Sequence, residues 1–193
     1  MKQNDIETEL DFAMGIEVIN RFISRIEGEE IEVELLYQIS IERKDKVGFH
    51  AAWILEKLCE KEADYALFFI DRLMIVFNQI ENKSTIRQYA KLLSNLLKLK
   101  NKKRLSIDLI NKLDNGQTNH IIETCFEQII DSKTQFSVKQ MCCEVLLNYI
   151  EKEVWIKDEL EEFCKDLSLR NTPSAQSYRR KLKAKLNKYN IIS

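Results

Sequence analysis

The stretch SVKQMCCEVLLNYI, residues 137–150, decides the fold. Counted from Val138, a basic residue follows at +1, a small residue at +4, and apolar residues at +7, +8 and +11. At about 100° per residue, these apolar positions fall on one narrow stripe of an α-helix. The pattern therefore predicts an amphipathic helix whose stripe is buried against neighbouring helices.

The same frame recurs elsewhere in the chain. It fits segments anchored at Ile86 and at Val47, where Gly48 replaces the basic residue, and more loosely at Tyr178, where Lys185 occupies +7. The four anchors are 39, 52 and 40 residues apart. Two of these intervals suit helical-hairpin repeats, and the third leaves room for one additional short helix. We expect the four anchors to face inward in successive layers of one stacked array.

Four glycines and one proline in 193 residues are few for a chain with many turns, which favours an all-α protein. Asn115-Gly116 is expected to end a helix as a C′ glycine does, and Thr172-Pro173 to start the last helix. The predicted helices span 5–27, 29–42, 44–61, 63–81, 83–100, 102–114, 118–131, 135–152, 155–168 and 173–189.

Two segments carry a family resemblance. SVKQMCCEVL (137–146) and TIRQYAKLLSNL (85–96) look like the second helix of HEAT/armadillo-type repeats. The stretch 125–150, together with TPSAQSYRRKLKAKL (172–186), also resembles a group of small HEAT-like proteins from Bacteroidetes, some of them labelled adenylosuccinate lyase. The flexible serine- and glycine-containing signature loop of that lyase superfamily is absent, so the label is not carried over.

The resemblance covers roughly residues 30–189 and implies a right-handed α-α superhelix of about ten helices and four helical hairpins. In such repeats the basic +1 residue often pairs with an acid or a backbone carbonyl of the adjacent repeat. We expect a single domain over 1–193, with an acidic N-terminal helix in 1–28, stacked hairpins in 29–189 and a tail in 190–193.

Composition favours a soluble globular protein, with 45% apolar and 32% charged residues. The N-terminus MKQNDIETELDF lacks the layout of a secretory signal, and the longest apolar tract, residues 65–77, is too short to span a bilayer. We expect a cytoplasmic protein without a membrane partner. Its five cysteines form no C-x-x-C pair and are expected to be reduced and buried.

No motif for chemistry stands out. His50 and His120 are far apart in sequence, no H-E-x-x-H motif occurs, and adjacent Cys142 and Cys143 point about 100° apart on a helix. The isolated glycines argue against a phosphate-binding loop. We therefore expect no catalytic residue, no cofactor and no metal, although a cysteine–histidine pair across helices remains open.

Charge is distributed unevenly. Residues 1–34 hold ten acidic and three basic residues, a net −7, whereas the chain after Asp166 holds seven basic residues and no acid, a net +7. A second acid-free block, 82–107, carries eight basic residues. A solvated face is the ordinary meaning of such runs, and an acidic or nucleic-acid partner is the alternative. The candidate partner-binding basic surface is Arg87, Lys91, Lys98, Arg179, Arg180 and Lys183.

These observations favour a non-enzymatic scaffold that binds a macromolecular partner, most simply a protein. The first alternative is nucleic-acid binding through basic residues of 83–104 and 170–188, which requires them to share one face. A second is a HEAT-like DNA glycosylase, but no aspartate matches its catalytic motif; Trp53 is expected in the core and Trp155 at a partly exposed helix start. Acidic residues 1–34 of one copy could also meet basic residues 170–188 of another.

Overall fold

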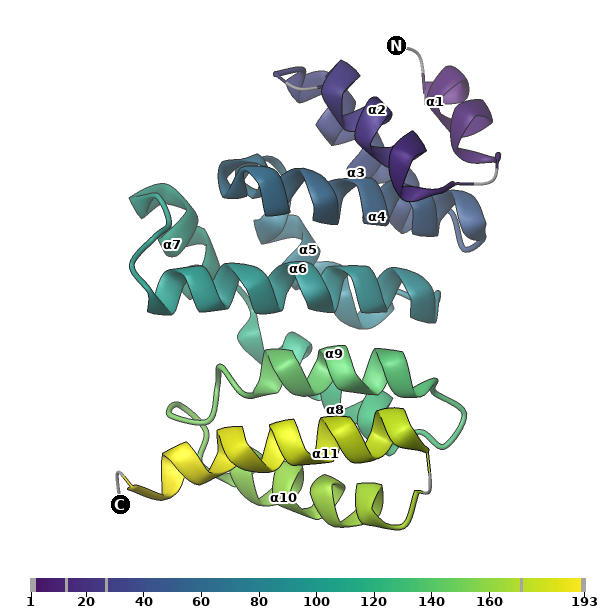
Figure 1. Cartoon of the computed structure of the whole chain (residues 1–193). Coiled ribbons are helices and arrows are strands. Elements are labelled where there is room, and N and C mark those ends of the chain that lie inside the picture. The colour runs from purple at the N-terminus through teal and green to yellow at the C-terminus, as the bar shows by residue number, and fades with distance from the viewer. Residues whose placement is uncertain (1–2, 13, 27, 171, 192–193) are drawn as a thin grey trace.

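The computed structural model describes residues 3–12, 14–26, 28–170 and 172–191, and within these ranges the chain is helical and contains no β-strand (Figure 1). The α-helices are α1 (Gln3–Leu10), α2 (Ile16–Ile26), α3 (Glu30–Glu42), α4 (Lys46–Lys61), α5 (Ile70–Val76), α6 (Lys83–Asn101), α7 (Ile107–Asn115), α8 (Thr118–Ile130), α9 (Phe136–Leu146), α10 (Trp155–Ser168) and α11 (Pro173–Leu186). Three short 3-10 helices are η1 (Ala63–Phe68), η2 (Phe77–Gln79) and η3 (Asn187–Ile191).

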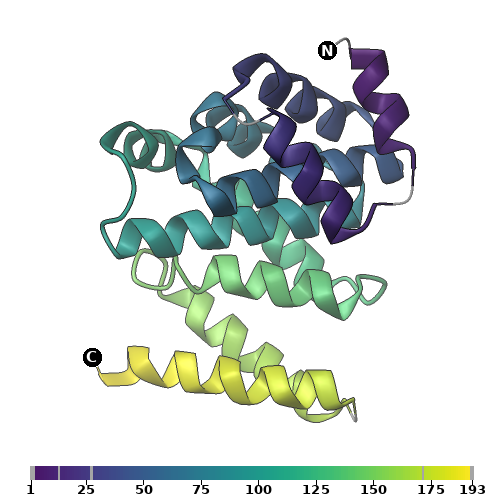
Figure 2. The same cartoon turned by 45° about the horizontal axis from the view of Figure 1, so that its top comes forward.

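The helices stack in order along the chain and form an all-α solenoid. Helix α3 packs on α4, α8 on α9 and α10 on α11, while α4, α6 and α9 pack on one another in succession. Figures 1 and 2 show α1 and α2 at one end of the stack and the hairpin α10–α11 at the other. We call the row formed by α4, α6, α9 and α11 the second-helix layer.

The repeat frame accounts for this stacking. The four anchors Val47, Ile86, Val138 and Tyr178 are 1%, 2%, 2% and 3% exposed, which confirms that they face inward. A lone helical hairpin buries only one face, so each layer supplies the cover that its neighbour needs. The predicted additional short helix in the longest interval is α7, and Thr172 caps α11 by accepting a hydrogen bond from the Ala175 amide.

The basic +1 residue is buried in the best-fitting repeat. Lys139 is 2% exposed, and its Nζ donates a hydrogen bond of 2.7 Å to the carbonyl oxygen of Ile129 in α8. A backbone carbonyl was one of the two expected acceptors, but it belongs to the first helix of the same hairpin rather than to an adjacent repeat. Burial, more than any other cause, lowers the pKa of Lys139.

Two of the predicted long helices are wrong in their extent. The segment 5–27 divides into α1 and α2, with a break that ends at Gly15, whose carbonyl accepts the first hydrogen bond of α2 from Ile19. The segment 63–81 divides into η1, α5 and η2, with Phe69 in a non-helical conformation (φ −146°, ψ −10°). This segment is rich in aromatic and β-branched residues of modest helix propensity, and the break places both Phe69 and Phe77 in the core.

Two other helix boundaries differ from the prediction. Helix α9 ends at Leu146 instead of continuing to 152. The Asn148 side chain caps the carbonyl oxygen of Glu144 at 2.7 Å, and the backbone amides of Asn148 and Tyr149 bond the carbonyl oxygens three residues back, so the chain leaves the α-helix in a turn. Helix α7 begins at Ile107 instead of 102, after a turn in which Lys103 has a positive φ of 56°.

Gly116 follows α7, but with φ −69° it does not adopt the left-handed conformation of a C′ glycine. A Cβ at this position would lie 2.3 Å from Cε of Met74, so a larger residue would require the flexible end of that side chain to move.

Candidate interaction surface

The residues considered for catalysis or metal binding serve the packing. His50 is buried, and its Nδ1 lies 2.8 Å from the carbonyl oxygen of Leu10. His120 is half-buried, with Nδ1 3.3 Å from the carbonyl oxygen of Ile75. Trp53 packs against the core, and Trp155, 48% exposed, stacks on Phe126, as predicted for both. In the part of the chain that the structure describes, no three metal-ligating side chains gather.

The five cysteines are free and buried. Burial raises the pKa of the Cys59, Cys125 and Cys143 thiols well above the ordinary value, which removes the thiolate needed for nucleophilic chemistry at neutral pH. The prediction of buried thiols that act as small apolar residues is confirmed.

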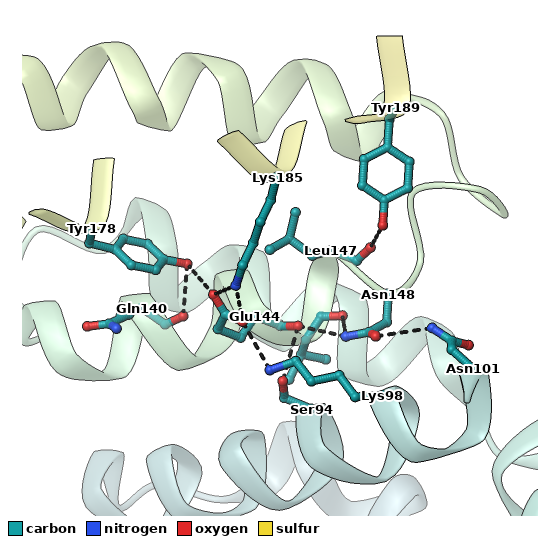
Figure 3. A network of polar contacts seen from close by, with 11 residues as sticks. Ser94, Lys98, Asn101, Gln140, Glu144, Leu147, Asn148, Tyr178, Lys185 and Tyr189 are labelled. Atoms are coloured by element: carbon teal, nitrogen blue, oxygen red, sulfur yellow. Dashed lines mark hydrogen bonds and ion pairs between the residues drawn. The ribbon is translucent and has the colours of Figure 1, made fainter. Parts of the chain in front are cut away.

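A network of polar contacts in the second-helix layer centres on Glu144 of α9 (Figure 3). Its carboxylate accepts hydrogen bonds from Lys185 of α11 at 2.5 and 2.6 Å and from Lys98 of α6 at 3.1 Å. The Tyr178 hydroxyl lies 3.3 Å from Glu144 Oε1. The Glu144 backbone carbonyl also accepts from Ser94 at 3.3 Å. One residue thus joins three successive layers, and we call this set of contacts the Glu144 clamp.

Electrostatics favour the charged form of Glu144. Burial alone would raise the pKa of this carboxyl, whose side chain is only 10% exposed. The hydrogen bond and charge of Lys185, together with those of Lys98, outweigh burial and hold the pKa below its ordinary value. Glu144 is therefore a carboxylate at neutral pH, and its two lysine partners, 45% and 40% exposed, remain partly open to solvent.

A groove opens over the clamp. It has a volume of about 370 Å³ and lies between the ends of α6, α9 and α11. Its charged lining consists of Lys98, Lys185, Lys188, Glu144 and Glu151, and its apolar lining of Leu147 and Tyr189. We call it the clamp groove. The Tyr189 hydroxyl donates a 3.0 Å hydrogen bond to the Leu147 carbonyl oxygen, which fixes the aromatic ring at the groove's edge.

A second groove, of about 300 Å³, lies between α4 and α6 and shares Lys98 with the clamp groove. We call it the α4–α6 groove. Its lining combines Leu96, Leu99 and Cys59 with Glu60 and Lys102. The two adjoining grooves therefore run across successive members of the second-helix layer and present apolar surface with charges of both signs.

Glu56 lies beneath the α4–α6 groove and is fully buried. Lys91 Nζ is 2.8 Å from Glu56 Oε1, but neither carboxylate oxygen has a well-directed hydrogen bond from any described residue. Burying a carboxylate without an opposite charge nearby destabilises the fold, and the ammonium group of Lys91 provides that charge for Glu56.

The six residues of the predicted basic surface divide between two places. Lys91 pairs with the buried Glu56, and Lys98 shares the carboxylate of Glu144 with Lys185. Arg87, on the same helix, is half-buried, and its Nε makes no hydrogen bond to a described residue.

Arg179, Arg180 and Lys183 lie on the last hairpin. Arg179 and Lys183 line a third groove, of about 360 Å³, between α10 and α11, together with Glu161 and Lys165. None of the three forms an ion pair with a described residue, in contrast to Lys91 and Lys98.

Part of the acidic charge at the N-terminal end is neutralised by basic residues of the same chain. Glu7 pairs with Arg43, Glu9 with Arg25, Asp11 with Lys46 and Glu34 with Arg72. These pairs leave less negative charge for a second copy than the sequence total suggests. Head-to-tail association stays a prediction.

Sequence reasoning named Lys98 but missed Glu144 and Lys185 of the clamp, although a signal was present for each. Glu144 interrupts the apolar run CCEVLL, so an acid stands among residues of a buried helix. Lys185 occupies the +7 position, which is apolar in the other three repeats. Each exception explains the other, because the lysine reaches the glutamate of the preceding layer.

A solenoid of stacked helical hairpins with its second helices in one row is the architecture of helical-repeat proteins. A family model described as a HEAT repeat domain matches residues 6–186, and the chain belongs to this family. Comparison with curated proteins gives no match, and neither does comparison with solved structures. Within the described ranges, no helix is long and apolar enough to cross a membrane.

Proposed function

We propose that the protein is a non-catalytic scaffold that binds a protein partner in the cytoplasm through its second-helix layer. HEAT repeats commonly mediate protein interactions, which supports an interaction role in general. The observation that carries the choice of surface is the pair of adjoining grooves around Lys98, whose lining mixes leucines with lysines and glutamates. Such a mixture of apolar and charged residues suits a folded or extended polypeptide.

The ion pairs of the second-helix layer favour protein over nucleic acid as the partner. A nucleic-acid surface needs several unpaired basic residues that follow a row of phosphates. In the second-helix layer, Lys91 is paired with Glu56, and Lys98 and Lys185 share Glu144, so the basic residues alternate with acids and form no continuous basic row. Arg179 and Lys183, which form no ion pair with a described residue, line a different groove, beside Glu161.

The test is site-specific photo-crosslinking in the native cytoplasm. A photoreactive residue replaces Leu99, which lines the α4–α6 groove, or Glu123, an exposed residue of α8 in the other row of helices. We expect Leu99 to give discrete protein adducts that persist after nuclease treatment, and Glu123 to give none of them. Adducts that disappear with nuclease would favour nucleic acid. Identical adducts from both positions would contradict the chosen surface.

A further inference from the structure

Two ammonium groups are held unusually close together at the clamp groove. Lys98 Nζ lies 3.1 Å and Lys185 Nζ 2.6 Å from the same oxygen, Oε2 of Glu144, so the two nitrogens are at most about 6 Å apart, and like charges at that separation repel each other. The buried carboxylate is what holds them together. Figure 3 shows both side chains reaching Glu144 from opposite sides, from α6 and from α11.

One carboxylate does not balance this pair. Two positive charges meet one negative charge at Glu144, which leaves an excess of one positive charge at the floor of the groove. Each ammonium has three donors, and Glu144 does not use all of them. Lys188, which has no ion pair with a described residue, and Glu151 also line the groove, so its lining holds three lysines and two glutamates and keeps a net charge of +1.

We infer that the clamp groove binds an acidic side chain of the protein partner, which Lys98 and Lys185 contact together while a neighbouring apolar side chain packs on Leu147 and Tyr189. A carboxylate has two oxygens that can each accept from one ammonium, and hydrogen bonds between charged groups are about twice as strong as neutral ones. Because Glu144 fixes the two lysines beforehand, little side-chain order is lost on binding. This inference rests on the proposed function and names the chemistry of the partner.

The groove fits a single acidic side chain better than a phosphate backbone. Its volume of about 370 Å³ holds one or two side chains. Glu151, which is exposed at the rim, would repel a continuing row of phosphates, whereas the net charge of +1 in the groove lining matches a single carboxylate. Leu147 and Tyr189 also provide an apolar surface beside the charges, on which the peptide residue next to the acid can be buried.

The experiment selects peptides from a random displayed library against the purified full-length chain and measures synthetic copies by fluorescence anisotropy. We expect the enriched peptides to share an aspartate or glutamate beside an apolar residue. Replacing that acid by its amide should weaken binding about tenfold or more, the loss of one charge-assisted hydrogen bond.

The chain offers a matched pair of variants. Lys188→Glu reverses a charge in the groove without touching the Glu144 clamp, and it should also weaken binding about tenfold. Lys181→Glu makes the same change on an exposed residue of α11 outside the groove and should leave binding unchanged. Circular dichroism of both variants checks that the fold is kept.

Three outcomes would overturn the inference: no enriched peptide with an acidic preference, equal binding by Lys188→Glu, or displacement of the peptide by a single-stranded oligonucleotide with the same dependence on Lys188. The photo-crosslinks from Leu99 distinguish failure of the acidic-side-chain site from failure of the proposed scaffold function. Protein adducts at Leu99 without an acidic preference would reject the carboxylate site and keep the scaffold role.

Discussion

The contact between α6 and α9 in the middle of the array differs from the contact between α9 and α11 at its end. Helices α6 and α9 run close together, and each carries a small buried residue at +4, Ala90 and Cys142. A small side chain at this position lets helix backbones approach, and a larger one would force them apart. The middle of the array is therefore held by tight apolar packing.

The backbones of α9 and α11 approach each other at few places. Helix α11 has Leu182 at +4, and long side chains reach across to α9 instead: Tyr178 and Lys185 to Glu144, and Tyr189 to the Leu147 carbonyl oxygen. One repeat frame thus gives two kinds of interface. We expect changes in the middle to affect the unfolding of the whole chain, and changes at the clamp to act mainly on the last hairpin.

The largest effect is expected from Leu93→Ala in α6. Leu93 is fully buried between layers, and removing its side chain leaves a cavity that should lower the free energy of unfolding by about 4 kcal/mol. Urea denaturation followed by circular dichroism measures it. Leu169→Ala is the control, because Leu169 is 82% exposed and its loss should cost almost nothing. Equal effects of the two variants would contradict the layered core.

The next largest effect is expected at Gly48, where the start of α4 lies close to the end of α3. A Cβ at Gly48 would lie 2.0 Å from the carbonyl oxygen of Arg43, so Gly48→Ala forces the start of α4 away from the end of α3. We expect a loss of about 3 kcal/mol, the cost of overpacking against backbone. Gly15→Ala is the matched control, since nothing lies within 4 Å of its Cβ position. A thermal melt in which both variants behave like the parent would rule out this close approach.

A smaller and local effect is expected from Glu144→Gln. The amide keeps the shape of the side chain but removes the negative charge that accepts three hydrogen bonds from Lys98 and Lys185, and we expect a loss of about 2 kcal/mol in the attachment of α11. Amide hydrogen exchange should become faster in α10 and α11 and stay unchanged in α4 and α6. Glu151→Gln, on an exposed residue of the same groove, should change neither. Uniformly faster exchange would mean that the clamp supports the whole array.

The smallest expected effect is the loss of stability in the last hairpin when Glu144 is protonated at low pH. Because the pKa of Glu144 is lower in the folded chain than in the unfolded chain, its contribution to stability is present above the unfolded value of about 4.3 and is lost as the pH falls through the folded value. Exchange protection of α11 should therefore decrease below about pH 4, after correction for intrinsic rates. The same titration of Glu144→Gln should lack this step, and its persistence there would assign it to another carboxylate.

Much of the fold could be predicted because the repeat is local. The stripe that begins at Val138 lies within one helix, and its burial follows from spacing alone. The broken segment 63–79 could not be predicted in this way. Its residues are apolar on all sides, so periodicity gives no preferred face, and burial of Phe69 and Phe77 by distant helices decides where the helix stops.

The clamp shows the same limit at the level of the site. Lys98 and Lys185 lie 46 and 41 positions from Glu144, and no local pattern relates residues so far apart. A run of lysines and arginines in the sequence shows where basic residues are, but it does not show which of them form ion pairs in the folded chain. The fold brings an acid to Lys91 and to Lys98, whereas Lys188 forms no ion pair with a described residue.

The buried cysteines have a practical consequence. They are distributed over the array, with Cys59 in α4, Cys125 in α8, Cys142 and Cys143 in α9 and Cys164 in α10. An alkylating reagent can reach the fully buried Cys125, Cys142 and Cys143 only when α8 and α9 separate from their neighbours, whereas Cys59 and Cys164 line grooves and are 5% and 9% exposed. The order in which the thiols are modified in native buffer would therefore record, without any engineered label, when the middle of the solenoid opens relative to its groove-lining surface.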